Sequence, residues 1–257
     1  MKTNKGLDAL LNRNTNKMSV NEYGLDTHYV GKNLNIFCRD INSYSPEQMH
    51  RALICLANTL PVKTDKETPQ TICANLLKTG RVVILDTETT GLGDADEVVE
   101  VGVLDQFAQP LIDTLIKPNG LIPLEATEIH KITTARANKD GMGWQVCQDL
   151  LAELEGFTVV MYNGVFDLKM IKQTDEIHAT PARIDLEPQT VDLMELANRH
   201  FIDSAQWHPE RSQFKRLSLK ACCELAGIEY PDDAHQALTD CRLTLALMQF
   251  IANDTGR

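Results

Sequence analysis

The spacing of apolar residues divides the chain into two parts. Residues 1–44 are rich in asparagine and show no sustained apolar period, so we expect a loop or a weakly ordered arm. A Ser-Pro start and apolar residues at helical spacing then predict one amphipathic helix over about 46–60, with Ala52, Leu53, Leu56, Ala57 and Leu60 on its apolar face. The polar stretch 62–70 is typical of a linker. The pattern predicts a small helical or irregular N-terminal extension, residues 1–75, before a larger domain, residues 76–257.

Beyond Arg81 the pattern becomes that of an α/β domain. The apolar run 82–85 is rich in β-branched residues and predicts a strand that is buried on both faces. Two further strands are predicted at 98–104 and 111–116, followed by alternating helices and strands. The later strands are expected at 158–161 and near Thr190, and the helices at about 125–131, 142–154, 164–172, 192–201, 217–226 and 234–252. We therefore predict a mixed five-stranded sheet flanked by helices.

Composition narrows the classes of protein that fit. The chain has 257 residues, of which 43% are hydrophobic, and it contains no apolar run of the ~20 residues that a membrane helix needs. Neither does its N-terminus resemble a secretory signal, so we expect a cytoplasmic protein without a membrane contact. The seven cysteines show no C-x-x-C pair, which favours reduced core thiols over disulfides or zinc.

The charge of the chain is acidic overall and basic in places. A formal net charge of −11 argues against a protein that coats nucleic acid through a general basic surface. An active site made of carboxylates and divalent cations is nevertheless compatible with an acidic chain. Residues 199–220 are locally basic, and Arg211, Lys215 and Arg216 alternate with aromatic residues, as expected at an entrance for a nucleic-acid strand. An ordinary solvated face is the alternative.

Two carboxylates follow the first predicted strand directly. In the segment D-T-E-T-T-G at 86–91, Asp86 and Glu88 are two residues apart and therefore share one face of an extended chain. Neighbouring carboxylates at the end of a buried strand repel each other, and a divalent cation commonly compensates. Taken alone, the segment also fits a simple capped turn.

Two more polar elements lie at predicted helix starts. In Y-N-G-V-F-D at 162–167, Asn163 occupies a helix-capping position and Asp167 falls on the first turn. In A-H-Q-A-L-T-D-C at 234–241, Asp240 borders an apolar stripe and His235 lies at or before the first turn. Each element is ordinary by itself, but in this order all three can converge on one edge of the sheet.

With these motifs the chain resembles the DEDDh, or DnaQ-like, family of 3′-5′ exonucleases, which have a ribonuclease H-like fold. The resemblance covers about residues 79–252 and includes four further segments: L-I-K-P-N at 115–119, I-H-K-I-T at 129–133, T-V-D-L at 190–193 and L-S-L-K-A at 217–221. It implies metal-dependent release of nucleoside 5′-monophosphates from the 3′ ends of DNA, RNA or both.

The resemblance also assigns roles to individual residues. It implies Asp86, Glu88, Asp167 and Asp240 as catalytic ligands of two Mg²⁺ or Mn²⁺ ions, and His235 as the catalytic general base. The family group that has tyrosine in place of histidine puts it four residues before the last aspartate, where this chain has Gln236. Residues implied in substrate binding are Thr89, Gly91, Leu92, His130, Asn163 and Phe166. Lys131 departs from the glycine that many members have after this histidine.

Alternatives to a free-standing nuclease are a proofreading subunit of a DNA polymerase and a catalytically inactive nucleic-acid-binding module. Retention of all five chemical residues argues against the inactive module. The short segment after the last predicted helix argues against the polymerase subunit, which carries a tail for binding the polymerase. The N-terminal extension has an apolar helix face that suits either the nuclease domain or a protein partner, and a homodimer also fits.

Overall fold

The computed structural model describes Ser45 and the ranges 67–201, 204, 207–208, 213–231 and 234–254. The helix predicted over 46–60 lies outside these residues. The chain forms two compact units, of which the larger comprises Thr68–Asp203 and Arg216–Arg257. In the smaller unit the described residues include a short antiparallel hairpin of β6 (Trp207–His208) and β7 (Gln213–Phe214). No helix in the described ranges is long and apolar enough to cross a membrane.

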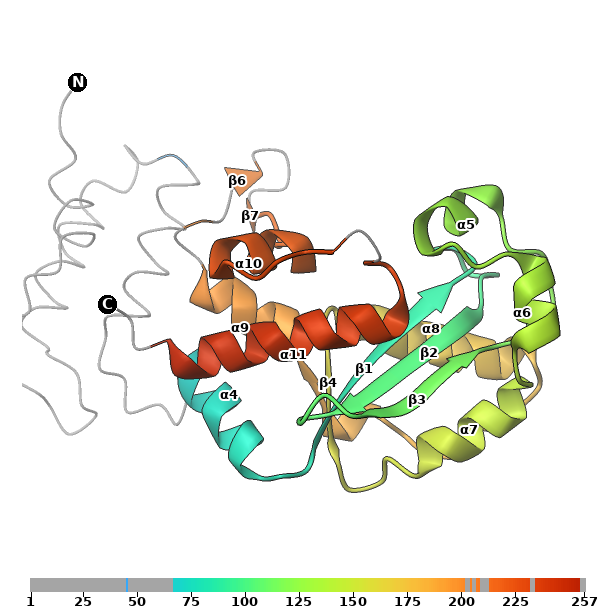
Figure 1. Cartoon of the computed structure of the whole chain (residues 1–257), viewed down its shortest axis with the longest axis horizontal. Helices are drawn as coiled ribbons and strands as arrows, with labels where there is room; N and C mark the ends of the chain where they lie inside the picture. Colours follow the sequence, from blue (N-terminus) through green and yellow to red (C-terminus); the bar gives the residue numbers. More distant parts are fainter. Residues whose placement is uncertain are drawn as a thin grey trace, which may run out of the picture. The chain divides into compact units, whose positions relative to one another are not determined.

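A five-stranded sheet in the order β3-β2-β1-β4-β5 forms the centre of the larger unit (Figure 1). The pairs β3-β2 and β2-β1 are antiparallel, whereas β1-β4 and β4-β5 are parallel. The mixed sheet predicted from the sequence is therefore confirmed. Its strands are β1 (Val82–Thr89), β2 (Val98–Asp105), β3 (Pro110–Leu115), β4 (Thr158–Met161) and β5 (Thr190–Asp192).

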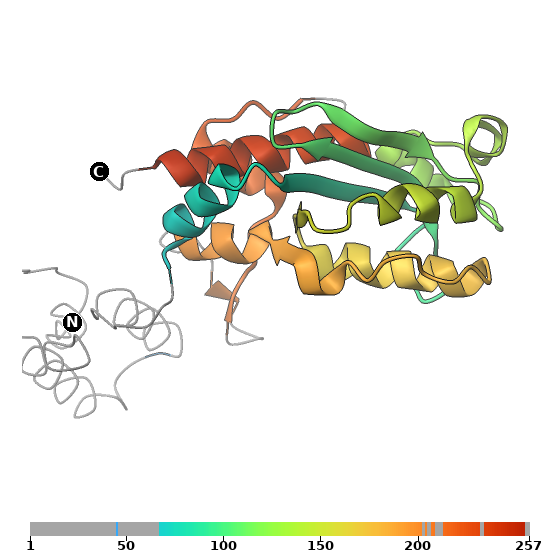
Figure 2. The same ribbon diagram turned by 90° about the horizontal axis from the view of Figure 1, so that it is seen from below.

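Helices cover both faces of this sheet, as Figure 2 shows. They are α4 (Pro69–Lys78), α5 (Leu124–His130), α6 (Thr134–Asp140), α7 (Trp144–Ala152), α8 (Gly164–Ile177), α9 (Leu193–His200), α10 (Leu219–Ala226) and α11 (Ala237–Asn253), with the 3-10 turn η2 (Glu187–Gln189) before β5. Four helices differ most from the prediction. The helices α4 and α6 were not predicted, α8 is longer than expected, and α11 begins at Ala237 rather than at 234.

The alternation of β1 explains why the sheet has two cores. Val83 and Leu85 point to the face covered by α7 and α8, where they pack with Trp144 and Met170. Val82 and Ile84 point to the opposite face of the sheet. There they pack in a second core with residues of α11, namely Cys241, Leu245 and Met248. A strand that is apolar on both sides is the expected centre of such a three-layer structure.

The segment predicted to be the end of a linker is part of the folded unit. Pro69 occupies the first turn of α4, and the Thr68 side chain caps the helix by accepting a hydrogen bond from the Thr71 amide at 3.1 Å. Cys73 is fully buried in the core formed with α11. The linker interpretation of residues 69–70 is therefore wrong, and the boundary expected between residues 75 and 76 falls inside a helix.

This packing predicts different stabilities for two shortened proteins. The protein 68–257 keeps α4, whereas 76–257 loses most of it, including the fully buried Cys73. Loss of one fully buried apolar side chain costs about 2 kcal/mol, which corresponds to roughly 4–8 °C in a domain of this size. We expect 76–257 to unfold at the lower temperature by at least this margin in circular dichroism. Equal unfolding temperatures would show that α4 adds nothing to the domain.

Candidate active site

Two carboxylates lie side by side at the end of β1, on the face covered by α11. Asp86 and Glu88 are each partly buried, and they pair with Gly102 and Glu100 of β2. The register of the ladder shifts between Glu88 and Thr89, so the strand leaves its regular pairing directly after the second carboxylate. The geometry confirms that these two side chains share one face of the strand.

The start of α11 brings two more groups to the same face. Asp240 is buried on the first turn of the helix, and the exposed His235 lies two residues before its first residue. His235 has a left-handed backbone with φ of 72°, and its amide donates to Asp240 at 3.4 Å. Ligand atoms of Glu88, His235 and Asp240 all lie within 4.8 Å of one another. These three residues therefore form one compact polar group.

Asp167 reaches the site from the opposite layer. It lies on the first turn of α8 and is 3% exposed. One of its carboxylate oxygens accepts two hydrogen bonds from Thr87, one from the backbone amide at 3.1 Å and one from the hydroxyl at 2.8 Å. Because Thr87 points away from the face of Asp86 and Glu88, it is available to orient the carboxylate of α8.

The concentration of negative charge changes the acidity of these groups. Burial raises the pKa of Asp86 well above its ordinary value. Repulsion from four neighbouring carboxylates raises this pKa further: Asp167, Asp240, Glu88 and Glu100. Burial, followed by repulsion from Asp240, raises the pKa of Glu88 to about 8. Burial also raises the pKa of Asp167 to about 7, although the hydrogen bonds from Thr87 act in the opposite direction.

This electrostatic conflict is the observation that fits a divalent cation. Carboxylate oxygens are the ligands that Mg²⁺ and Mn²⁺ prefer, and a cation reverses the repulsion that otherwise favours protonation. Glu88 and Asp240 are close enough to share one ion, with His235 beside them. Asp86 and Asp167 are outside this compact group but close enough to contribute to its field. The donor set therefore suits a hard divalent cation.

Sequence reasoning missed one carboxylate. Glu100 lies in β2 directly opposite Glu88, is 7% exposed and accepts a hydrogen bond from the amide of Ala237 at 2.9 Å. A glutamate inside the apolar strand V-V-E-V-G-V-L was the available signal, because a charged residue on a buried strand needs a partner.

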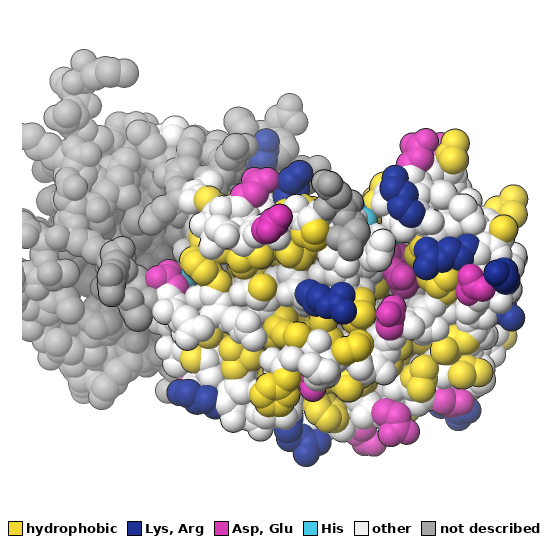
Figure 3. Space-filling view, viewed as in Figure 1, with side chains coloured by type: hydrophobic (Ala, Val, Ile, Leu, Met, Phe, Trp, Pro, Cys, Tyr) yellow, Lys and Arg dark blue, Asp and Glu magenta, His cyan; other side chains and the backbone are white. Residues whose placement is uncertain are grey.

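A pocket of about 480 Å³ opens beside the carboxylates. It is lined by five of the residues that the sequence predicted for substrate binding: Thr89, Gly91, Leu92, His130 and Phe166. Leu92 is 80% exposed at its rim. The surface is notched between the start of α11 and α5, with acidic side chains beside the notch (Figure 3).

His130 is the buried polar group of this pocket. It is 3% exposed, and its Nδ1 accepts a hydrogen bond from the Ile132 amide at 3.0 Å. Its Nε2 is buried and makes no hydrogen bond within the described part of the chain. Burial lowers the pKa of His130, which favours the neutral ring with a proton on Nε2. The Thr89 backbone acts on the same ring in the opposite direction to burial, so His130 gives the pocket a buried ring N–H beside Thr89.

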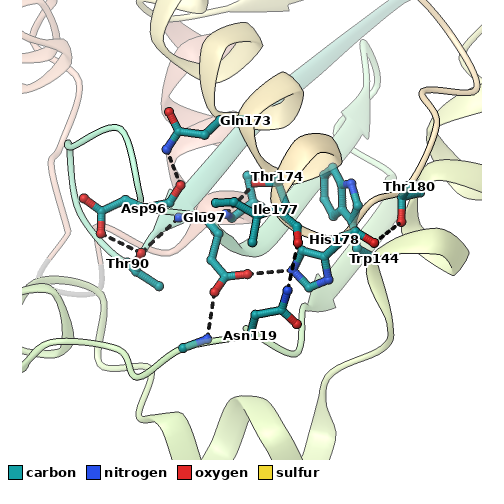
Figure 4. Close-up of polar contacts among 12 residues, drawn as sticks. Thr90, Asp96, Glu97, Asn119, Trp144, Gln173, Thr174, Ile177, His178 and Thr180 are labelled. Carbon is teal, nitrogen blue, oxygen red and sulfur yellow. Dashed lines mark hydrogen bonds and ion pairs between the residues drawn. The ribbon is translucent and has the colours of Figure 1, made fainter.

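The loop that carries Leu92 is fixed by a polar network (Figure 4). Thr90 donates to Asp96 at 2.8 Å and accepts from the amide of Glu97 at 3.0 Å. Gln173 of α8 donates to the carbonyl oxygens of Gly93 and Asp96, and His178 contacts the Glu97 carboxylate at 2.6 Å. These contacts attach one wall of the pocket to the helix that supplies Asp167.

One of the six residues predicted for substrate binding lies outside this pocket. Asn163 does not line it, and its side chain does not cap α8; it takes a left-handed backbone conformation, and its amide donates to Asp192 at 3.0 Å. Asn163 therefore occupies the predicted N-cap position of α8, but its side chain makes no capping hydrogen bond. In the predicted strand entrance, Arg211 lies outside the described residues, whereas Lys215 and Arg216 are exposed. The strand entrance stays a prediction.

The sequence matches the RNase_T exonuclease family over residues 83–248. An uncharacterized exonuclease, CP81, of Escherichia phage 186 is 32% identical over 176 residues, which cover 66% of this chain and 87% of the phage protein. The DNA polymerase III epsilon subunit of Rickettsia typhi is 26% identical and is matched over 69% of this chain and 75% of its own length.

Solved structures agree in fold. Exonuclease I from Methylocaldum szegediense superposes with a TM-score of 0.53 at 21% identity, covering 68% of this chain and 41% of that one. E. coli exonuclease I, solved with a dA16 oligonucleotide, gives the same TM-score at 18% identity with the same coverage. The chain thus spans about two fifths of these exonucleases. The family match, the ribonuclease H-like sheet and the carboxylate site agree, and the chain belongs to the RNase_T exonuclease family of DEDDh type.

Proposed function

We propose that this protein is a metal-dependent 3′-5′ exonuclease that releases nucleoside 5′-monophosphates from single-stranded ends. The observation that carries the proposal is the placement of the carboxylates and His235 directly beside a pocket of about 480 Å³. The pocket is large enough for one nucleotide and is open at the side where Leu92 is exposed. Hydrolysis next to such a pocket removes one terminal unit at a time.

The residues divide the work of hydrolysis between them. Asp86, Glu88, Asp167 and Asp240 would hold two Mg²⁺ or Mn²⁺ ions. Such ions polarise the attacking water and stabilise the leaving oxygen when they are bound. A ring nitrogen of the exposed His235 takes the proton of the water, since an imidazole exchanges protons near neutral pH. Thr87 keeps the Asp167 carboxylate in one orientation through its two hydrogen bonds.

The pocket positions the terminal nucleotide. Leu92 and Phe166 provide apolar contact for a base, and the buried Nε2–H of His130 provides a hydrogen-bond donor for an oxygen of the sugar or the phosphate. The fold is shared with E. coli exonuclease I, which has been solved in a complex with single-stranded DNA. Single-stranded DNA is therefore the first substrate class to test, with RNA as the comparison.

A second function has support from the relatives. Epsilon subunits of DNA polymerase III from Rickettsia typhi and Buchnera aphidicola resemble this chain, at 26% and 29% identity. A polymerase-associated proofreading nuclease uses the same chemistry but needs a contact with a polymerase. We assign such a contact, or a contact with another partner, to residues 1–67, which precede α4 in the sequence, whether or not the protein forms a homodimer.

The first prediction concerns activity and polarity. The full chain with Mg²⁺ or Mn²⁺ is expected to shorten a 3′-protruding DNA strand from its 3′ end and to release mononucleotides. Asp86→Asn and Asp167→Asn are expected to lose nearly all turnover while remaining folded, because each removes a charge that the cations need. The measurement is gel electrophoresis of matched 5′-labelled and 3′-labelled oligonucleotides of DNA and RNA.

The controls for this assay are chosen outside the site. Asp149→Asn changes an exposed carboxylate on α7, whose partner is Arg183 at 3.0 Å, and should keep full activity. Shortening from the 5′ end, or appreciable turnover by either site variant, would refute the proposed function.

A further prediction concerns the metal-free protein. Glu88 has an ordinary pKa of 4.5 and a folded-state pKa of about 8, so the folded state binds more protons than the unfolded state between these values. Stability in EDTA should therefore fall as the pH rises from about 5 to about 8, and Mn²⁺ should restore it at pH 8. Thermal unfolding of the wild type and of Glu88→Gln isolates this contribution from that of the histidines. If stability depended on pH with the same slope in both proteins, the raised pKa of Glu88 would not contribute to it.

The role of His235 can be separated from that of a ligand. His235→Ala is expected to lower kcat by about 10²- to 10⁴-fold, the usual contribution of a general base. Calorimetry should show nearly unchanged affinity for Mn²⁺, because the carboxylates that hold the cation remain. His235 lies close enough to Glu88 and Asp240 to serve as a ligand, so joint loss of affinity and activity would assign it that role instead.

A further inference from the structure

Glu100 is a buried carboxylate that has no role in the hydrolysis proposed above. It lies in β2, between β1 and β3, in a strand whose other residues are almost all buried and apolar. Burial raises its pKa and outweighs the hydrogen bond from Ala237 and the charge of Arg136, which lower it, while Asp113 and Asp240 add repulsion. An apolar residue at this position would avoid that cost. A specific contact must therefore account for a glutamate here.

That contact is with the first residue of α11. The Glu100 Oε2 accepts a hydrogen bond from the Ala237 amide at 2.9 Å. The N-cap residue Gln236 makes no side-chain capping bond, although its carbonyl accepts from Thr239 and Asp240. The first amides of a helix need acceptors and attract negative charge. Glu100 thus caps α11 from a neighbouring strand.

The helix start is also packed against the sheet at very short range. A Cβ atom on Gly102 would lie 2.6 Å from the backbone of Ala237 and Leu238, so only glycine permits this approach. One turn later, the Cys241 thiol contacts the carbonyl oxygens of Gly102 at 3.3 Å and Ile84 at 3.5 Å. The hydrogen bond to Glu100 therefore acts where the start of α11 lies directly against β2.

The catalytic groups of α11 depend on this contact. Asp240 is three residues after Ala237, and His235 is two residues before it and donates its amide to Asp240. We propose that Glu100 is a positioning residue that fixes the first turn of α11, and with it Asp240 and His235, against Glu88, through its hydrogen bond to Ala237. The proposal rests on the proposed function and denies Glu100 the role of a further metal ligand.

Two conservative variants separate reach from charge. Glu100→Gln keeps an oxygen at the same distance from Ala237 and removes the charge, whereas Glu100→Asp keeps the charge and shortens the side chain. Loss of an outer residue that orients ligands typically lowers metal affinity or activity by about 10- to 100-fold. We expect this loss in kcat and in Mn²⁺ affinity for Glu100→Asp, with KM nearly unchanged because Glu100 does not line the nucleotide pocket. For Glu100→Gln, both kcat and Mn²⁺ affinity should stay within about 3-fold of the wild-type values, a much smaller change than that expected for Glu100→Asp.

The measurements use the full chain with Mn²⁺ alone for calorimetry and with a labelled oligonucleotide for kinetics. Asp113→Asn, which removes an exposed neighbouring charge without touching the hydrogen bond, is the matched control and should behave as wild type. Amide exchange followed by NMR should show Ala237 protected in Glu100→Gln and unprotected in Glu100→Asp. This readout remains valid if Glu100→Asp is too unstable for kinetics.

The outcomes are distinct. Full activity and Mn²⁺ affinity in Glu100→Asp, or a loss in Glu100→Gln as large as in Glu100→Asp, would overturn the positioning role, and the second result would favour a role for the charge. If the wild type lacks nuclease activity, the proposed function fails, while Mn²⁺ affinity and protection of Ala237 still decide whether Glu100 orders the start of α11.

Discussion

Repulsion between carboxylates at the end of a buried strand is the constraint on which this structure depends. Asp86 and Glu88 lie where β1 leaves the core, and Asp167 and Asp240 add to their field. Water screens charges poorly at such a place, so each carboxylate raises the pKa of its neighbours. An apolar protein core gains nothing from this arrangement, whereas a cation site requires it. The repulsion between the carboxylates at the end of β1 is thus the property that favours binding of a cation there.

The three-layer architecture allows four carboxylates to meet without crowding one element. β1 supplies two, α11 supplies Asp240 from one face, and α8 supplies Asp167 from the other. Thr87 lies between the two carboxylates of β1 in sequence but points to α8, where it orients Asp167. Within three residues, the alternation of the strand therefore presents two carboxylates on one face and holds a third carboxylate, that of Asp167, on the other.

The amino-acid sequence was sufficient for the elements whose signal is local. The period of two in β1 placed Asp86 and Glu88 on one face, and the apolar runs predicted the five strands. Contacts between distant segments left no such signal. Pro69 looked like part of a linker because the partner that buries Cys73 is α11, more than 160 residues later. A glutamate in an apolar strand signals that Glu100 needs a partner, but the sequence does not indicate which one, since the amide that it accepts from is 137 residues away.

Stability and activity place opposite demands on the start of α11. Release of the first turn would let Asp240 move away from Glu88 and would relieve repulsion in the metal-free protein. The Ala237 hydrogen bond, the glycine at 102 and the thiol of Cys241 all act against that movement. Preorganisation of this kind lowers the cost of ordering ligands when a cation binds, because the carboxylates already occupy their places. In the metal-free protein the sheet therefore holds the carboxylates together against their repulsion. A site without these contacts would instead lose conformational entropy when the cation binds.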